Sequence, residues 1–328
     1  MKIENKTLFH AEALPLIAPS GETALTVIVK ATFEINSGAP AKEQQSIAFG
    51  DEFAEEGVVR YESDIIPVKP ATDVALFATA HAPDNAPVEC VPVSVSVGPV
   101  QKKLMVFGER FWNHKGVLSR NYVKTKAKPF LTKPIVYADA FGGVDPDTGE
   151  YCPENLSGKG CYAPKSKTNL AGRPLPGIED PRHLIRTIKD RPPPTGLGFY
   201  GRAWQPRAGY AGTFDDTWRK TRSPKPPEDF DPRFYNGAHP DLQVQGYLRG
   251  DEAVELINLT PTGRESFHLP GIRPTCRVHA KTAPEFISMR LDTLFIEPDE
   301  NRFILVWRGN GPDPAAVTRV EIDVFTMD

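Results

Sequence analysis

The chain has 328 residues, and its 39 Lys and Arg against 42 Asp and Glu give a formal charge of −3. This near balance argues against a dedicated nucleic-acid-binding protein, whose surface would carry a clear basic excess. The 33 Pro and 26 Gly exclude a helical bundle, because inside a helix Pro costs about 3 kcal/mol and Gly about 1 kcal/mol. We therefore expect a mostly β protein of strands and irregular loops.

The first residues and the cysteines favour a soluble cytoplasmic protein. No apolar segment follows the charged residues at positions 1–6, so no secretory signal is visible. The longest apolar runs, such as 303–307, have the length of a strand and are too short to span a membrane. The four Cys are too sparse for a disulfide-stapled fold, and no Cys-x-x-Cys pair indicates a metal site. We expect reduced, mostly buried cysteines and neither a metal nor a cofactor.

Residues 1–128 are predicted to form an antiparallel β region. The run 24–35 is rich in β-branched residues and alternates in its second half, as a strand with one buried face does. Residues 73–81 are predicted to form a further strand, which stops at the turn residues 82–85.

A hairpin is predicted within the same region. Apolar and polar residues alternate strictly over 91–97, Gly98-Pro99 then turns the chain, and residues 103–107 form a second apolar run. One face of the first strand consists of Val side chains, which indicates a sheet that packs on a core with one face.

Residues 129–240 differ in kind. Seventeen of the 33 Pro lie there, interleaved with aromatic residues that a disordered linker would lack. We predict a long ordered loop region with a few short helices, pinned by its aromatic side chains and stiffened by Pro. The clearest helix spans 213–221, with Thr213 as its cap, acids in its first turn and bases in its last. Phe214 and Trp218 would share one face of it.

Residues 241–328 return to β structure. The run 255–261 ends in a turn, and 302–308 and 317–325 are predicted strands. The fold class is therefore mostly β, with antiparallel, sandwich-like regions at both ends and the loop region between them. The C-terminal region either stands alone or forms one composite domain with residues 1–128.

No complete catalytic motif is present. The chain has no Gly-x-Ser-x-Gly elbow, no phosphate-binding Gly-rich loop with its Lys and Ser or Thr, and no His-Glu-x-x-His pair. Asp215 and Asp216 are better explained as capping and dipole partners of the helix than as an acid–base pair. The acids within 228–231 are interpreted as turn residues that bond their own backbone, with a carboxylate metal site as the alternative.

A hydrolase remains an alternative. Cys161 with His183 or His239 is a conceivable nucleophilic pair, although the sequence does not place these residues together. A site of this kind would require several ionisable groups of the central loops to meet in one pocket. The candidates are His183, Asp215, Asp229, His239 and Asp241.

A set of short motifs occurs in one order along the chain. They are Lys69–Val74 (KPATDV), Lys128–Phe130 (KPF), Asp139–Gly143 (DAFGG), Leu175–Pro181 (LPGIEDP), Gly196–Phe199 (GLGF), Trp204–Arg207 (WQPR), Ala211–Trp218 (AGTFDDTW), Pro227–Asn236 (PEDFDPRFYN), Asn258–Gly263 (NLTPTG), Leu291–Leu294 (LDTL) and Trp307–Gly309 (WRG). Together they resemble the bacterial family catalogued as domain of unknown function 2169, over about residues 5–325. The resemblance implies a cytoplasmic adaptor or chaperone that binds a type VI secretion effector and helps to load it on the VgrG or PAAR spike. It implies no catalytic residue.

An adaptor needs a binding surface, and Trp, Tyr and Arg dominate interface hot spots. Stiff Pro-rich loops also lose less entropy on docking. The interaction candidates are Arg202, Trp204, Arg207, Phe214, Trp218, Phe230, Arg233 and Phe234. The alternative is that these rings form the core of the loop region. We expect an effector and a VgrG or PAAR protein as partners, and no nucleic acid, membrane insertion or small-molecule substrate. A structural part of the secretion apparatus is the third hypothesis.

Overall fold

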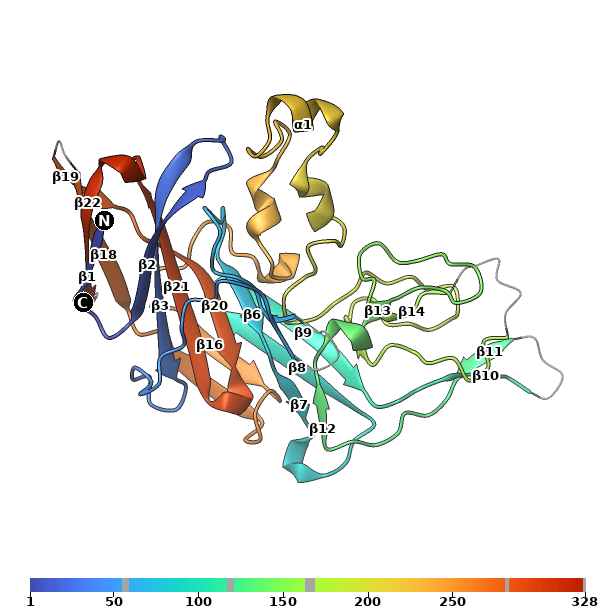
Figure 1. Cartoon of the computed structure of the whole chain (residues 1–328). Coiled ribbons are helices and arrows are strands. Elements are labelled where there is room, and N and C mark those ends of the chain that lie inside the picture. The colour runs from blue at the N-terminus through green and yellow to red at the C-terminus, as the bar shows by residue number, and fades with distance from the viewer. Residues whose placement is uncertain (55–58, 117–120, 163–168, 281–282, 327–328) are drawn as a thin grey trace.

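The computed structural model describes residues 1–54, 59–116, 121–162, 169–280 and 283–326. It confirms the mostly β fold: three sheets of four or five strands form the body of the molecule (Figure 1). Among the described residues, α1 (Asp216–Thr221) is the one α-helix, and the other helical pieces are 3₁₀ turns. No helix of the described part is both long and apolar enough to cross a lipid bilayer.

The central sheet contains strands from both ends of the chain. Its order is β2 (His10–Ile17), β3 (Thr23–Glu34), β21 (Arg302–Gly311), β20 (Arg290–Glu297) and β6 (Asp73–Leu76). Its neighbours are antiparallel except β20 and β6, which run parallel. β3 and β21 therefore lie side by side although most of the chain separates them in sequence (Figure 1).

The other two large sheets also combine distant segments. One has the order β15 (Ile178–Glu179), β9 (Val100–Phe107), β8 (Cys90–Val97), β16 (Ala253–Ile257) and β17 (Arg264–His268). The other has the order β1 (Lys2–Asn5), β22 (Val317–Thr326), β18 (Ile272–Ala280) and β19 (Pro284–Ile287). β1 and β22 run parallel, whereas the sequence predicted antiparallel pairing in both terminal regions.

Eight short strands form two-stranded pairs at the periphery. They are β4 (Glu52–Phe53) with β5 (Val59–Tyr61), β7 (Thr79–His81) with β12 (Thr132–Pro134), β10 (Trp112–His114) with β11 (Tyr122–Lys124), and β13 (Phe141–Gly142) with β14 (Lys159–Gly160). Between residues 129 and 240 the described chain thus contains only short elements joined by loops, as the Pro content predicted.

The predicted hairpin is confirmed. β8 and β9 pair antiparallel, and Gly98 between them has φ of 48°, a conformation that favours glycine. Val91, Val93, Val95 and Val97 are all buried, so the alternation did identify the core face. The long strand predicted at 24–35 is confirmed as β3.

The single strand predicted at 73–81 is wrong. The chain forms β6, which pairs with β20 in the central sheet, and then β7, which pairs with β12 outside it. The backbone N–H of Phe77 still bonds Ile296 of β20, whereas the next paired residue, Thr79, faces Pro134. No Gly or Pro marks this change of partner, so the residue pattern could not reveal it.

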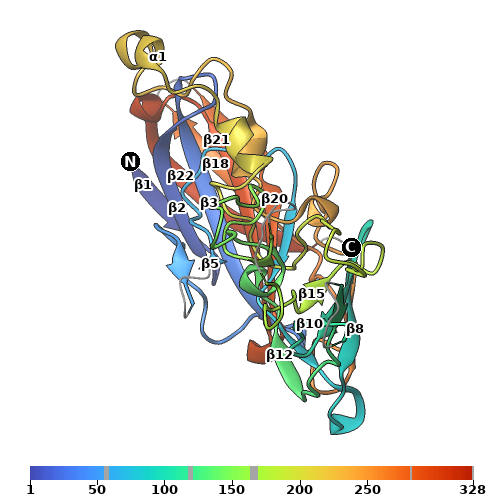
Figure 2. The ribbon, with the colours of Figure 1, turned by 90° about the vertical axis from the view of Figure 1, so that its right-hand side faces the viewer.

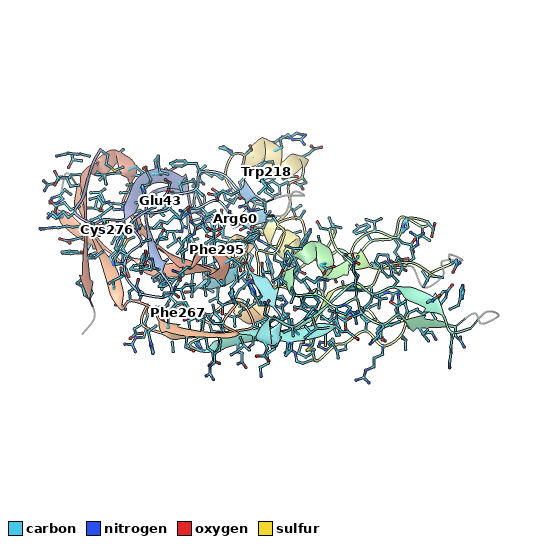
Figure 3. All side chains as sticks on the ribbon, turned by 90° about the horizontal axis from the view of Figure 1, so that it is seen from below. Glu43, Arg60, Trp218, Phe267, Cys276 and Phe295 are labelled. Atoms are coloured by element: carbon cyan, nitrogen blue, oxygen red, sulfur yellow. The ribbon has the colours of Figure 1, made fainter. Side chains whose placement is uncertain are left out.

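Both faces of the central sheet are covered. One face, including Val29, Leu305 and Trp307, shares a single apolar core with inward-facing residues of the other two large sheets. The opposite face, with Phe295 and Val306, packs against Tyr61 and Phe199. Figure 3 labels Phe295 within these layers. β3, β20 and β21 are therefore buried on both sides, which explains their nearly continuous apolar sequences.

The helix of the loop region is shorter than predicted. It begins after Asp215, whose carboxylate accepts a hydrogen bond from the backbone N–H of Trp218 at 2.7 Å, so Asp215 and not Thr213 is the cap. Thr213 instead donates its backbone N–H and its hydroxyl to Asp229. The predicted acids and bases do lie in the first and last turns. Phe214 and Trp218 contact each other as expected, with ring centroids 4.7 Å apart.

Candidate functional site

All eight interaction candidates lie in residues 202–234, which belong to a projecting segment that we define as residues 201–235. It consists of α1 and two 3₁₀ turns, Arg207–Ala211 and Pro232–Tyr235, that pack on each other. Figures 1 and 2 show α1 standing clear of the three sheets, and Figure 3 places Trp218 outside the layers that contain Phe295. The segment is therefore exposed on several sides while its two ends return to the body.

Arg207 anchors the base of the projecting segment. Its Nη1 and Nη2 donate to the two carboxylate oxygens of Glu62, at 2.5 and 2.8 Å, and both side chains are buried. The guanidinium also donates to the carbonyl oxygens of Tyr200 at 2.6 Å and Phe234 at 2.8 Å. Every guanidinium nitrogen is thus engaged inside the protein. Arg207 holds the segment in place and offers no free surface to a partner.

Trp204 and Arg202 line an apolar groove beside this anchor. The groove has a volume of about 260 Å³, and its walls include Phe77, Ile135 and Tyr137. The Trp204 ring meets that of Tyr137 edge to face, with centroids 5.3 Å apart. Arg202 binds both oxygens of Asp51, at 2.8 and 2.9 Å, and stays partly exposed. The groove therefore combines an aromatic wall with a fixed positive group.

The tip of the projecting segment presents a second aromatic pair. Phe214 is 55% exposed and packs edge to face on Trp218. The indole N–H of Trp218 donates to the carbonyl oxygen of Lys225 at 2.9 Å, which fixes the ring orientation. A rigid, solvent-facing aromatic pair is the kind of group that anchors protein interfaces.

The remaining candidates brace the segment from the side. Phe230 lies 5.8 Å from Phe234, measured between ring centroids, and both rings are half-buried. Arg233 pairs with Asp231 at 2.5 Å and stands over the ring of Tyr210. The hypothesis that the rings form the core of the loop region thus describes Phe230 and Phe234 best. Asp231 also accepts the N–H of Arg233, as a turn residue does.

The histidine candidates meet elsewhere. His183, His239 and Asp241 line one cavity of about 300 Å³, together with Lys102 and Asp180. The other two acids of the hydrolase hypothesis do not reach it, because Asp215 caps α1 and Asp229 bonds Thr213. Within the described part of the chain, no group of three or more His, Cys, Asp or Glu is arranged to hold a metal ion.

The hydrogen bonds of His239 restrict its chemistry. Its Nδ1 accepts the backbone N–H of Asp241 at 3.1 Å, and its Nε2 lies 3.3 Å from the ammonium nitrogen of Lys102. Burial, and then the nearby positive charge of Lys102, lower the pKa of His239 to about 4. The ring is therefore neutral at pH 7, and both of its nitrogens face hydrogen-bond donors. A proton added to it would lie beside the positive charge of Lys102, which makes His239 a poor general base.

The charged neighbours of His239 form a closed network. Lys102 donates to Asp241 at 2.7 Å and lies 3.5 Å from Asp180, and Arg182 bonds both carboxylates. Burial raises the pKa of Asp241 and of Asp180, but these hydrogen bonds and positive charges outweigh it and hold both pKa values below their usual range. The sequence placed His183, His239 and Asp241 among the hydrolase candidates, but its pattern did not single out Lys102, Asp180 or Arg182.

The three buried cysteines are poor nucleophiles. Cys152, Cys161 and Cys276 are buried, as expected for most of the four, and Cys90 is exposed. Cys161 packs in an apolar cluster with Trp112, and burial raises its pKa. Burial raises the pKa of Cys152 to about 11. These thiols are protonated at pH 7, and the structure gives Cys161 no contact with the His239 cavity.

The fold and these sites define a three-sheet β protein with a projecting aromatic segment, an adjacent apolar groove and a buried ionic pocket. The chain belongs to the family described as "Uncharacterized protein conserved in bacteria (DUF2169)", whose sequence profile matches residues 20–308. Searches of curated proteins and of solved structures found no significant match.

Proposed function

We propose that this chain is a cytoplasmic adaptor or chaperone that binds a type VI secretion effector and promotes its loading on the VgrG or PAAR spike. The family match over residues 20–308 supports the proposal only through what the resemblance to this family implies, a role in type VI secretion. The observation that carries it is the projecting segment, which presents the Phe214–Trp218 pair at its tip and the Trp204 groove beside its base.

Physical arguments favour this surface as the effector contact. The groove is mostly apolar and has a rigid aromatic wall, so an apolar side chain of the effector would gain burial there without ordering the adaptor. Arg202, held by Asp51 at the rim, can add one directional hydrogen bond. The buried Arg207–Glu62 pair keeps the segment in one position before binding, which lowers the entropy lost on association.

Co-expression with the effector encoded beside this chain tests the proposal. The two proteins should co-purify, and Phe214→Ser and Trp204→Ala should each weaken the complex about tenfold or more, as loss of an interface anchor does. Phe286→Ser is the matched control, because Phe286 is 76% exposed on β19, outside the projecting segment. It should leave binding unchanged.

Trp218→Ala separates an interface role from a structural one. An interface role predicts lost binding with an unchanged melting curve, whereas a core role predicts unfolding. Clean separation of the two proteins on gel filtration, with an effector equally stable and equally secreted without this chain, would refute the proposal. Loss of all secretion on deletion, instead of loss of one effector, would favour a structural component of the apparatus.

A hydrolase is the second candidate function, because His183, His239 and Asp241 do line one cavity. The lowered pKa of His239 and the contact of its ring with Lys102 weigh against it. His239→Asn retains an acceptor for the Asp241 N–H, since the Oδ1 of Asn can take the place of Nδ1. The adaptor proposal expects this variant to bind and export the effector normally, and a hydrolase would lose its activity.

A further inference from the structure

Three of the short motifs, far apart in sequence, meet at one place. Thr293 of LDTL lies on β20 and Arg308 of WRG on β21, whereas Lys69 of KPATDV precedes β6. Each of the three is at most 6% exposed. Lys69 Nζ donates to Asp73 at 2.8 Å and to Thr293 Oγ1 at 2.9 Å. Thr293 donates to Asp292 Oδ1 at 2.9 Å, and Arg308 Nε donates to Asp292 Oδ2 at 2.6 Å. The three motifs therefore form one buried hydrogen-bonded network.

A β-bulge shapes this network. The pairing of β20 with β21 shifts between Leu291 and Thr293, so Asp292 is the extra residue. Bulges redirect a side chain, and they are frequent beside functional sites. Without the bulge, strict alternation would place Asp292 and Thr293 on opposite faces of the sheet. With it, both side chains join the same network.

The network borders a cavity of about 300 Å³. Lys69, Asp292 and Arg308 line it, together with Arg290 and Asn310. Arg308 Nη1 donates to the carbonyl oxygens of residues 64 and 66, but Nη2 has no hydrogen-bond partner among the described residues. Asn310 uses its Oδ1 to accept from Thr26, which leaves its amide N–H groups available. Hydrogen-bond donors of Arg308 and Asn310 are thus free at the cavity.

Arg290 adds an uncompensated positive charge. It is exposed, has no ion pair within the described residues, and lies over the ring of Tyr247 with its guanidinium carbon 4.9 Å from the centroid. Lys69 is neutralised by Asp73 and Arg308 by Asp292. With Asp73 counted beside Lys69, the groups at the cavity carry one net positive charge, together with donors and no free carboxylate oxygen. A monoanion with two acceptor oxygens matches this arrangement, whereas a phosphate dianion would leave an unbalanced negative charge.

We propose that this cavity is a carboxylate-binding site, in which Arg290, Arg308 and Asn310 hold the carboxylate of a peptide or of a small organic acid. Its volume is at the lower end for ligand sites and suits one side chain or chain terminus. The site does not depend on the adaptor proposal, because it lies in the body of the molecule and contains none of the interaction candidates.

Nuclear magnetic resonance of the arginine Nε–H groups tests the site on the full chain. Arg308 Nε–H is buried in its bond to Asp292, so it should give a resolved signal beside the cavity. Titration with sodium acetate should change the chemical shift of this signal until the change saturates. Acetamide and sodium chloride should produce no saturable change. Three probes distinguish a chain terminus from an acidic side chain: N-acetyl-alanyl-alanine, its C-terminal amide, and N-acetyl-glutamate α-amide, which keeps a free side-chain carboxylate. Tighter binding of either carboxylate supports the site.

Two variants leave the buried network intact. Arg290→Gln should weaken acetate binding about tenfold, as loss of one charge-assisted hydrogen bond does. Asn310→Asp keeps the acceptor for Thr26 but places a negative charge at the cavity, and it should abolish binding. Arg249→Gln is the control, an exposed arginine outside the cavity, and should bind as the unmodified chain does. Three results would each overturn the proposal. Acetate could shift the Arg308 signal only linearly and no more than chloride does, or both variants could bind acetate with unchanged affinity. Inorganic phosphate could also bind more tightly than acetate.

Discussion

The contribution of Arg207 to the stability of the protein can be measured by replacing it with Met. The substitution leaves Glu62 buried without its partner and removes the donors to two backbone carbonyls. Removing one member of a buried ion pair costs about 3–5 kcal/mol, mainly because the remaining charge is uncompensated. We therefore expect Arg207→Met to lower the free energy of unfolding by that amount. Arg202→Met is the matched control: its pair with Asp51 is partly exposed, so it should cost about 1 kcal/mol or less.

Urea unfolding followed by both tryptophan fluorescence and far-ultraviolet circular dichroism is the assay. If the projecting segment detaches before the sheets unfold, the fluorescence change, to which Trp204 and Trp218 contribute, will precede the dichroism change. Combining Arg207→Met with Glu62→Leu removes the unpaired charge, so the double variant should recover about 2 kcal/mol relative to Arg207→Met. A loss below about 1 kcal/mol in the single variant, or simple additivity in the double one, would refute the reasoning.

Three further predictions concern pH, thiols and a motif glycine. Burial and Lys102 lower the pKa of His239 to about 4, whereas the same side chain in the unfolded chain binds a proton near pH 6.5. The stabilisation that this difference gives the folded state is complete above pH 6.5, and about 3 kcal/mol of it is lost as the pH falls toward 4. In His239→Asn the urea midpoint should depend less on pH between about 4 and 6.5. An unchanged slope there would contradict the lowered pKa of His239. A thiol reagent should modify only Cys90 rapidly in the native protein, because the other three thiols are buried; two or more fast thiols would be inconsistent with the fold. Gly143 has φ of 88°, and a Cβ there would lie 2.2 Å from the carbonyl oxygen of Gly158, so Gly143→Ala should cost about 3 kcal/mol or more in urea unfolding. Gly149→Ala, with φ of 72° and open space, should cost only about 1 kcal/mol, and equal losses in the two variants would show that the close contact is unimportant.

The sequence predicts those parts of the fold that depend on neighbouring residues. The alternation of Val91, Val93, Val95 and Val97 identified both a strand and its buried face, because side chains alternate along any strand. The pattern could not show that residues 73–81 change sheets, since the run stays strand-like throughout and no Gly or Pro interrupts it. Nor could the pattern select Asp215 instead of Thr213 as the helix cap, since both residue types cap helices well.

Which of the interaction candidates are exposed and which are buried could not be predicted from the sequence. Composition alone selected the projecting segment, because Trp, Arg and Pro gather there. It could not distinguish Arg202, partly exposed at the groove, from Arg207, which meets Glu62 across 145 positions of sequence. The same limit applies to Lys69 and Thr293, whose hydrogen bond spans 224 positions. Contacts of that range follow from the sheet order, which no local pattern contains.

The pairing of β3 with β21 also has a consequence for how the protein is made. About 270 residues separate the end of β3 from the start of β21, and a ribosome that adds 5–20 residues per second needs roughly 15–50 s to deliver them. Throughout that interval the apolar β3 has emerged without its main neighbour and is open to non-native pairing. A nascent chain interrupted before β20 would lack the middle of its central sheet, so translation must pass Gly311, the end of β21, before the native sheet can close.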